Sequence, residues 1–147
     1  RLSWNDPVNG YAAKHSIPYN VAVRLVRGTN DLEAYSEETV NDPQVQAMTR
    51  RVTVREDPTM TASLPDVRPA RIEVRMKNGR KLAETIERPR GGFDMPVTEN
   101  ELVEKFRRLS GMTLTSTSTE ALEQMVLGLP EVADVRSLSP VLQGVMP

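Results

Sequence analysis

Residues 70–86 read ARIEVRMKNGRKLAETI, and this stretch decides the fold class. Apolar and polar side chains alternate on both sides of Asn78-Gly79, which is typical of a β-hairpin. A two-residue turn would pair Lys77 with Arg80 and would mix charged and apolar side chains on both faces. A three-residue loop that ends on a left-handed glycine pairs Met76 with Arg80 instead. This bulged register is predicted because it collects the apolar side chains on one face. The residues on that face are Ala70, Ile72, Val74, Met76, Leu82 and Ile86, with Glu84 as the one charged member.

A helix is predicted for residues 17–27, well before the hairpin. Ser16 is a suitable N-cap, and Pro18 falls in the first turn, where it removes no hydrogen bond from the helix. Gly28 follows the last helical residue, at the position where a left-handed residue closes many helices. Apolar residues recur at helical spacing in a wide stripe, which is typical of a well-buried helix. They are Ile17, Val21, Ala22, Leu25 and Val26.

Two further helices are predicted after the hairpin. Thr98 and Glu101 have the spacing of a capping box, so a helix should begin after Thr98, and Gly111 should close it. Thr117 and Glu120 have the same spacing and predict the start of another helix after a spacer rich in Thr and Ser. The order of helices, hairpin and helices predicts an α+β fold, in which a small antiparallel sheet with a bulged hairpin packs against several helices.

Three other segments complete the expected secondary structure. Residues 1–14 are rich in turn-forming side chains and are predicted to be a loop. Residues 52–54 read Val-Thr-Val and are predicted to be a short strand. Residues 57–69 contain three prolines and are predicted to be a surface loop.

Composition and charge exclude several classes of protein. The 147 residues hold 19 basic and 20 acidic side chains, and this formal charge of −1 argues against binding to nucleic acid or anionic lipid. No apolar run approaches the roughly 18 residues that a membrane span needs. The chain has no cysteine, so it supplies no thiolate nucleophile and no cysteine-held metal site. No signal peptide is visible and the first residue is Arg1, so we expect a piece of a longer, cytoplasmic protein.

Few side chains are candidates for chemistry. His15 is the only histidine; it could act as an acid or base, or be a polar residue beside a helix start. Ser16 is a conceivable nucleophile, but its role as the N-cap of the predicted helix already explains a serine at this position. Arg88, Arg90 and the pair Gly91-Gly92 could form a backbone nest for an anion. Six basic residues could attract a polycarboxylate or could be the solvated charges that protect a sheet edge. They are Arg68, Arg71, Arg75, Lys77, Arg80 and Lys81.

Six short motifs follow one another along nearly the whole chain. Residues 13–23 read AKHSIPYNVAV, residues 42–45 read DPQV, and residues 52–58 read VTVREDP. The hairpin turn reads KNGR, the segment after it begins with PRG, and the next helix carries ELVEKF. In this order they resemble the C-terminal domain of the MmgE/PrpD family, with Asn78 standing where the family usually has Asp. The last residues, from Leu122 to Leu142, are similar to its terminal helices.

The resemblance implies part of an enzyme. Members of the family include 2-methylcitrate dehydratase, cis-aconitate decarboxylase and iminodisuccinate epimerase, which move a proton next to a carboxylate without a metal or another cofactor. In these longer proteins a small α+β domain closes as a lid over an active site supplied mostly by an all-helical domain. The resemblance therefore implies a lid-type domain over residues 1–112. It also implies that residues 113–147 form helices that pack on a helical domain absent from this chain.

The resemblance also singles out candidate site residues. It implies His15 as the catalytic residue and contact between the substrate and Ser16, Tyr19, Arg90 and Gly91, with no metal and no cofactor. The substrate would be a small di- or tricarboxylate, as in a 2-methylcitrate dehydratase-like lyase or isomerase, and the isolated chain should be inactive. Apolar surface left without its helical domain would favour a homo-oligomer. The alternative is a non-catalytic α+β module for binding or oligomerisation.

Overall fold

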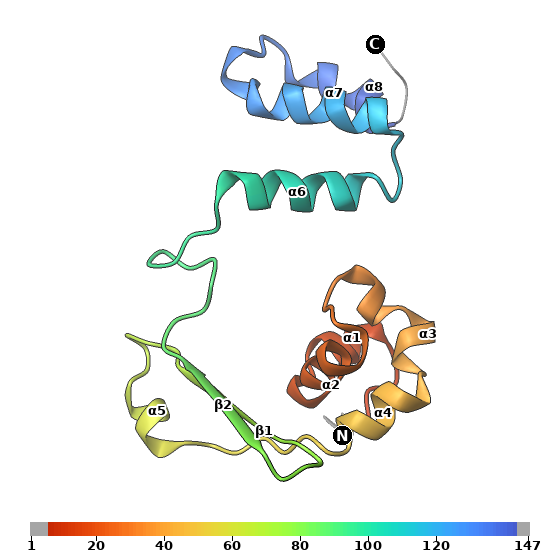
Figure 1. Cartoon of the computed structure of the whole chain (residues 1–147). Coiled ribbons are helices and arrows are strands. Elements are labelled where there is room, and N and C mark those ends of the chain that lie inside the picture. Colours follow the sequence, from red (N-terminus) through yellow and green to blue (C-terminus); the bar gives the residue numbers. More distant parts are fainter. Residues whose placement is uncertain (1–5, 144–147) are drawn as a thin grey trace. The chain divides into compact units, whose positions relative to one another are not determined.

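The computed structural model describes residues 6–143, which form two compact units (Figure 1). The first unit runs up to Ala62 and the second begins at Ser63. Among the described residues, no helix is both long enough and apolar enough to cross a membrane. The elements of the first unit are α1 (Gly10–Lys14), α2 (Ile17–Arg27), the 3-10 helix η1 (Leu32–Tyr35), α3 (Glu37–Val40), α4 (Pro43–Thr49) and α5 (Pro58–Ala62).

Helix α2 has the predicted ends, but the predicted buried stripe is wrong in part, because Ile17 and Leu25 are exposed while Tyr19 and Val23 are buried. The hydroxyl of Ser16 accepts a hydrogen bond from the backbone N–H of Tyr19, 3.1 Å away, and Pro18 lies in the first turn. Gly28 closes the helix in the left-handed conformation, with φ of 75°, and donates to the carbonyl of Arg24. Both caps satisfy backbone groups that have no partner within the helix, which explains why α2 begins and ends where it does.

The core of the first unit lies around one face of α2, which packs against α4. Removing these side chains from water is the main contribution to the stability of the unit. Its members are almost completely buried: Ala13, Tyr19, Val23, Ala34, Val40 and Val45.

Three predictions for the first 69 residues are wrong in part. Residues 1–14 are not all loop, because Asn9 caps the short helix α1 by accepting from the backbone N–H of Ala12. Residues 52–54 have no strand structure; strand pairing needs a neighbouring strand, and the described residues of this unit offer none. The proline-rich segment 57–69 contains helix α5, whose first turn is held by the carboxylate of Asp57.

The hairpin of the second unit has the predicted bulged register. Strands β1 (Ala70–Arg75) and β2 (Lys81–Ile86) are antiparallel, and Val74 lies opposite Leu82. The backbone N–H of Met76 donates to the carbonyl of Arg80 at 2.8 Å, and Gly79 adopts φ of 84°. The hydrophobic pattern therefore selects the register through the left-handed glycine that the three-residue loop requires.

The second unit continues with α6 (Glu99–Ser110), α7 (Ser116–Leu127), the 3-10 helices η2 (Leu129–Glu131) and η3 (Val135–Ser137), and α8 (Leu138–Leu142). The capping box of Thr98 and Glu101 is present at the start of α6, as predicted. The box predicted at Thr117 is wrong, because Thr115 caps α7 by accepting from the N–H of Ser118. Helices and a two-stranded antiparallel sheet together confirm the α+β class.

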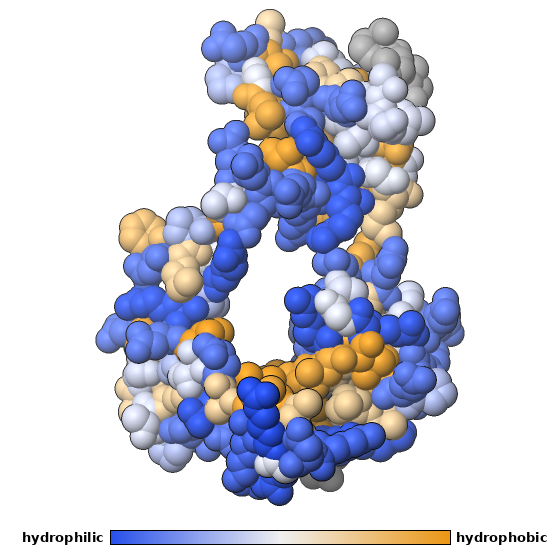
Figure 2. Space-filling model, viewed as in Figure 1, coloured by the Kyte–Doolittle hydropathy of each residue, from blue (hydrophilic) through white to orange (hydrophobic). Residues whose placement is uncertain are grey.

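The apolar face of the hairpin remains accessible to solvent. Ile72, Leu82 and Ile86 each expose between 41% and 49% of their surface, so the described helices of the second unit do not bury this face. Figure 2 shows hydrophobic side chains reaching the surface among mostly hydrophilic ones. The division of the chain at residue 112, and the packing of residues 113–147 on a further helical domain, stay predictions.

A bidentate ion pair links α6 to α7. The Nε and Nη2 atoms of Arg107 donate to the two carboxylate oxygens of Glu123, at 2.6 and 2.7 Å, and only 6% of Glu123 is exposed. The hydrogen bonds from Arg107 lower the pKa of Glu123 below its ordinary value. The folded state therefore favours the ionised carboxylate of Glu123. The ion pair contributes its full stability at a pH above the pKa that Glu123 has in the unfolded chain.

The pair makes stability depend on pH. As pH falls through the lowered pKa of Glu123, its carboxylate takes up a proton and this contribution is lost. We expect Glu123→Gln to flatten the fall in stability between about pH 6 and pH 3. Urea unfolding, followed by circular dichroism across this pH range, measures the effect. The exposed Glu131, changed to Gln, is the control, and an equally steep acid transition in both variants would contradict the prediction.

Candidate functional site

His15 lies at the corner where α1 ends and α2 is about to begin. It is the C-cap of α1, and its backbone N–H donates to the carbonyl of Ala12 at 3.2 Å. Its side chain is exposed and meets the ring of Tyr11 edge to face, with ring centroids 4.8 Å apart. The corner therefore presents an imidazole to solvent, in reach of a molecule outside the unit.

Ser16 and Tyr19 lie next to His15 but point into the first unit. Ser16 is buried, and its hydroxyl caps α2. Tyr19 is 1% exposed, and its phenol donates to the carbonyl of Ala34 at 2.5 Å. Burial, helped by the neighbouring Tyr35 and Asp42, raises the pKa of Tyr19 to about 12, so the phenol stays protonated at neutral pH. Both contacts are structural, and substrate binding by these residues stays a prediction.

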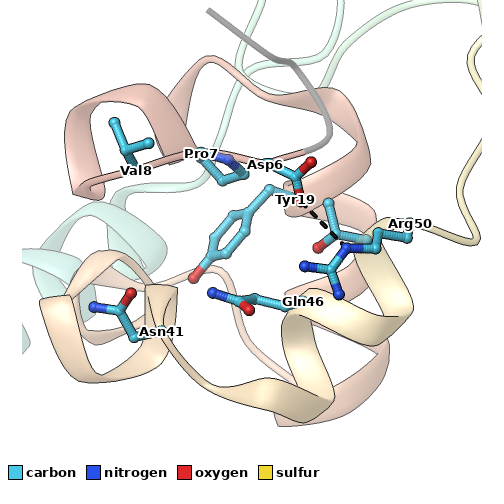
Figure 3. A pocket seen from close by; sticks show the side chains of 8 residues that line it. Asp6, Pro7, Val8, Tyr19, Asn41, Gln46 and Arg50 are labelled. Carbon is cyan, nitrogen blue, oxygen red and sulfur yellow. Dashed lines mark hydrogen bonds and ion pairs between the residues drawn. The ribbon is translucent and has the colours of Figure 1, made fainter.

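A cavity of about 380 Å³ opens beside the ring of Tyr19 within the first unit (Figure 3). Besides that ring it is lined by Asp6, Pro7, Val8, Asn41, Gln46, Thr49 and Arg50. Arg50 and Asp6 form an exposed ion pair across the wall, with 3.3 Å between Nε and Oδ1. Of the residues predicted for the site, only Tyr19 belongs to this lining. Sequence reasoning missed the cavity because its walls come from segments more than 40 residues apart, with no shared motif.

Arg90 and Gly91 belong to the second unit, where Arg90 contacts helix α6 and Gly91 contacts its own loop. Arg90 forms an ion pair with Glu101, at the start of α6. The N–H of Gly91 donates to the carbonyl of Met95 at 2.7 Å, and the N–H of Gly92 donates to the carbonyl of Pro89 at 3.4 Å. Neither amide is left for an anion, so the predicted backbone nest is wrong. Contact between a substrate and Arg90 or Gly91 stays a prediction.

The basic residues near the hairpin are exposed, and the contacts of Arg71 favour the structural interpretation of that charge. Its guanidinium donates to Glu73 on the same strand at 2.8 Å and to Thr85 on the opposite strand at 3.2 Å. Such contacts are typical of a solvated sheet edge. Among residues 6–143, no three His, Asp or Glu side chains gather closely enough to hold a metal ion.

Comparison with known proteins connects these features to a family. Residues 2–131 match the model of the MmgE/PrpD C-terminal domain. The chain is 26% identical to a cis-aconitate decarboxylase of Aspergillus terreus over 139 residues, which are 93% of this chain and 28% of the fungal protein. It is also 26% identical to the human cis-aconitate decarboxylase over 141 residues, 96% of this chain and 29% of that protein.

The mouse cis-aconitate decarboxylase is similar to the same extent, with 25% identity over 138 residues. The chain therefore spans less than a third of the length of these relatives, and in each case nearly all of it is aligned. The family model covers the corner at His15, the hairpin and helices α6 and α7. The chain belongs to the MmgE/PrpD family, of which it is a C-terminal domain.

Proposed function

We propose that this chain is the C-terminal domain of a metal-independent lyase or isomerase that acts on a small di- or tricarboxylate. The observation that carries the proposal is the family match over residues 2–131, supported by the similarity to cis-aconitate decarboxylases. These relatives make decarboxylation of cis-aconitate the first reaction to test. Dehydration of 2-methylcitrate and epimerisation of iminodisuccinate are the further candidates.

The proposed chemistry needs a group that moves a proton next to a carboxylate and groups that stabilise the negative charge that develops. We assign the proton transfer to His15, because imidazole is suited to acid–base work near neutral pH and this side chain is exposed at a corner. Ser16 and Tyr19 hold the start of α2 beside it. The guanidinium of Arg90 is the proposed contact for a carboxylate group of the substrate, and Gly91 holds the loop that carries it through its hydrogen bond to Met95.

The proposal also extends to the rest of the protein. A helical domain outside this chain supplies the other catalytic groups, the domain described here closes over them, and the isolated chain is inactive. The exposed apolar residues of the hairpin support burial against another surface, either that domain or a second copy in a homo-oligomer.

The test is the activity of the full-length protein that carries this sequence. Purified protein is assayed with cis-aconitate, 2-methylcitrate and iminodisuccinate, and turnover of one of them is expected. His15→Ala should lower kcat/KM at least tenfold, which corresponds to about 1.4 kcal/mol of transition-state stabilisation.

Tyr11→Phe is the matched control, because it keeps the ring beside His15 and should keep the activity. A folded His15→Ala variant that loses less than tenfold would remove His15 from the mechanism. Absence of turnover with all three acids would favour the non-catalytic module.

A further inference from the structure

Asn20 occupies an unusual place for an asparagine. It lies inside helix α2, is half-buried, and comes four residues after the N-cap Ser16. Asparagine is a poor residue for a helix interior, because its amide competes for backbone groups. Helical side chains tilt toward the N-terminus, so the amide of Asn20 points back to the corner that carries His15. Because helix propensity disfavours asparagine here, the contacts of the Asn20 side chain have to explain its presence.

The NH₂ group of Asn20 donates hydrogen bonds to backbone carbonyls on both sides of His15. Its Nδ2 lies 3.1 Å from the carbonyl oxygen of Ala13 and 3.3 Å from that of Lys14, at the end of α1. It lies 2.8 Å from the carbonyl oxygen of Ser16, at the start of α2. The last carbonyls of a helix have no partner within it. Here the carbonyl of Ala13 accepts from the backbone N–H of Ser16, and the amide of Asn20 is a further donor to it and a donor to the carbonyl of Lys14. The three carbonyls bracket His15 in the sequence.

The acceptor side fixes which way the amide faces. Its Oδ1 accepts from the phenol of Tyr35 at 2.5 Å and from Nδ2 of Asn30 at 3.2 Å. Asn30 also donates to the backbone carbonyl of Asn20 at 2.9 Å. Because the three corner carbonyls can only accept, the NH₂ group has to face them, which leaves Oδ1 for Tyr35 and Asn30. Asn20 thus joins α1, α2, the segment after α2 and η1 through one amide.

We infer that Asn20 is a positioning residue for His15: its amide sets the α1–α2 corner on which the imidazole stands. The inference rests on the proposed function, in which His15 transfers the proton. A reacting group has to be held within about 0.5 Å of its productive position. The exposed imidazole has only Tyr11 as a ring neighbour among the described residues, so its place depends on the backbone of the corner.

The exchange Asn20→Asp tests the inference in the full-length protein. It keeps the shape of the side chain but turns the three hydrogen bonds to the corner into contacts between oxygens. We expect kcat to fall about tenfold with little change in KM, because orientation of the acid–base group is lost while substrate binding is kept. The hairpin variant Asn78→Asp is the matched control. Asn78 Oδ1 accepts from the N–H of Arg80 and a carboxylate accepts equally well, so activity should be unchanged.

A double-mutant cycle with His15→Ala separates positioning from general damage. If Asn20 acts through His15, adding Asn20→Asp to the His15→Ala variant should lower kcat by less than about twofold. The reason is that the effects of two residues that act together are not additive. A full, independent loss in both backgrounds would overturn the inference. If His15→Ala itself has no effect on turnover, the proposed role of His15 fails instead, so the two failures are distinct.

Tyr35→Phe provides a second variant if Asn20→Asp does not fold. It removes the hydroxyl that Asn20 Oδ1 accepts from but keeps the ring, which packs beside Tyr19 with centroids 6.2 Å apart. We expect a smaller fall in kcat, about threefold, which likewise vanishes in the His15→Ala background. A Tyr35→Phe loss that persists without His15 would count against the inference. Circular dichroism of each variant identifies any that are unfolded.

Discussion

Tyr19→Ala is expected to lower the free energy of unfolding of this chain by about 3–5 kcal/mol, the range for replacing a large buried aromatic residue with alanine. Tyr19 is among the largest fully buried side chains, and it belongs to the core cluster that includes Val23 and Val45. Its removal leaves a space in a close-packed unit and takes away the donor to Ala34. Urea unfolding followed by circular dichroism measures the loss.

Tyr19→Phe separates the ring from the hydroxyl. The ring still fills the core, but the buried carbonyl of Ala34 loses its donor, which costs about 1–3 kcal/mol. Tyr11→Phe, on a side chain that is 74% exposed, is the control and should change stability little. If the free energy of unfolding of Tyr19→Ala lay within about 1 kcal/mol of that of the original chain, this core would not be the main source of its stability. The same variants in the full-length protein show whether the phenol also contacts substrate, because Tyr19→Phe would then lower kcat/KM beyond its effect on folding.

Gly10→Ala is expected to destabilise the chain by about 3 kcal/mol, although glycine-to-alanine exchanges inside helices usually stabilise. Gly10 is the first residue of α1, and a Cβ built there overlaps the backbone oxygen of Tyr35 and lies 3.3 Å from its carbonyl carbon. Backbone atoms cannot swing away as a flexible side chain can, so α1 and η1 would have to separate. The midpoint of urea unfolding should fall accordingly.

Gly28→Ala is the comparison for this prediction. Nothing lies within 4 Å of a Cβ at Gly28, but its φ of 75° is in the left-handed region, which costs other residues about 1–2 kcal/mol. Gly10→Ala should therefore lower the free energy of unfolding more than Gly28→Ala does, although Gly10 has no positive φ that would disfavour alanine. The reverse order would mean that the contact between Gly10 and Tyr35 is looser than the structure has it.

Elements that depend on neighbouring residues were predictable. Ser16, Pro18 and Gly28 specify the two ends of α2 within 13 residues, and the capping box at Thr98 specifies the start of α6. The hairpin register follows from the alternation of apolar residues around Gly79. In each case the interactions that decide the structure join residues only a few positions apart, so the local sequence contains them.

Elements that depend on distant partners were missed. Residues 52–54 have strand-forming side chains but no strand to pair with, and β-propensity without a partner does not make a strand. The start of α7 is a smaller case: the capping box was predicted at Thr117, but in the structure Thr115 accepts from the N–H of Ser118.

The candidate site divides in the same way. The sequence alone determined the helix that follows His15, the hairpin turn and the motifs that resemble the MmgE/PrpD family, because these depend on capping, alternation and short spacings. Only the tertiary structure decided that Tyr19 is buried, that the amides of Gly91 and Gly92 are occupied, and that Asn20 holds the corner. The physical reason is that burial and hydrogen-bond partners depend on which segments meet when the chain closes on itself, and no local spacing encodes the meeting of Asn20 with Tyr35.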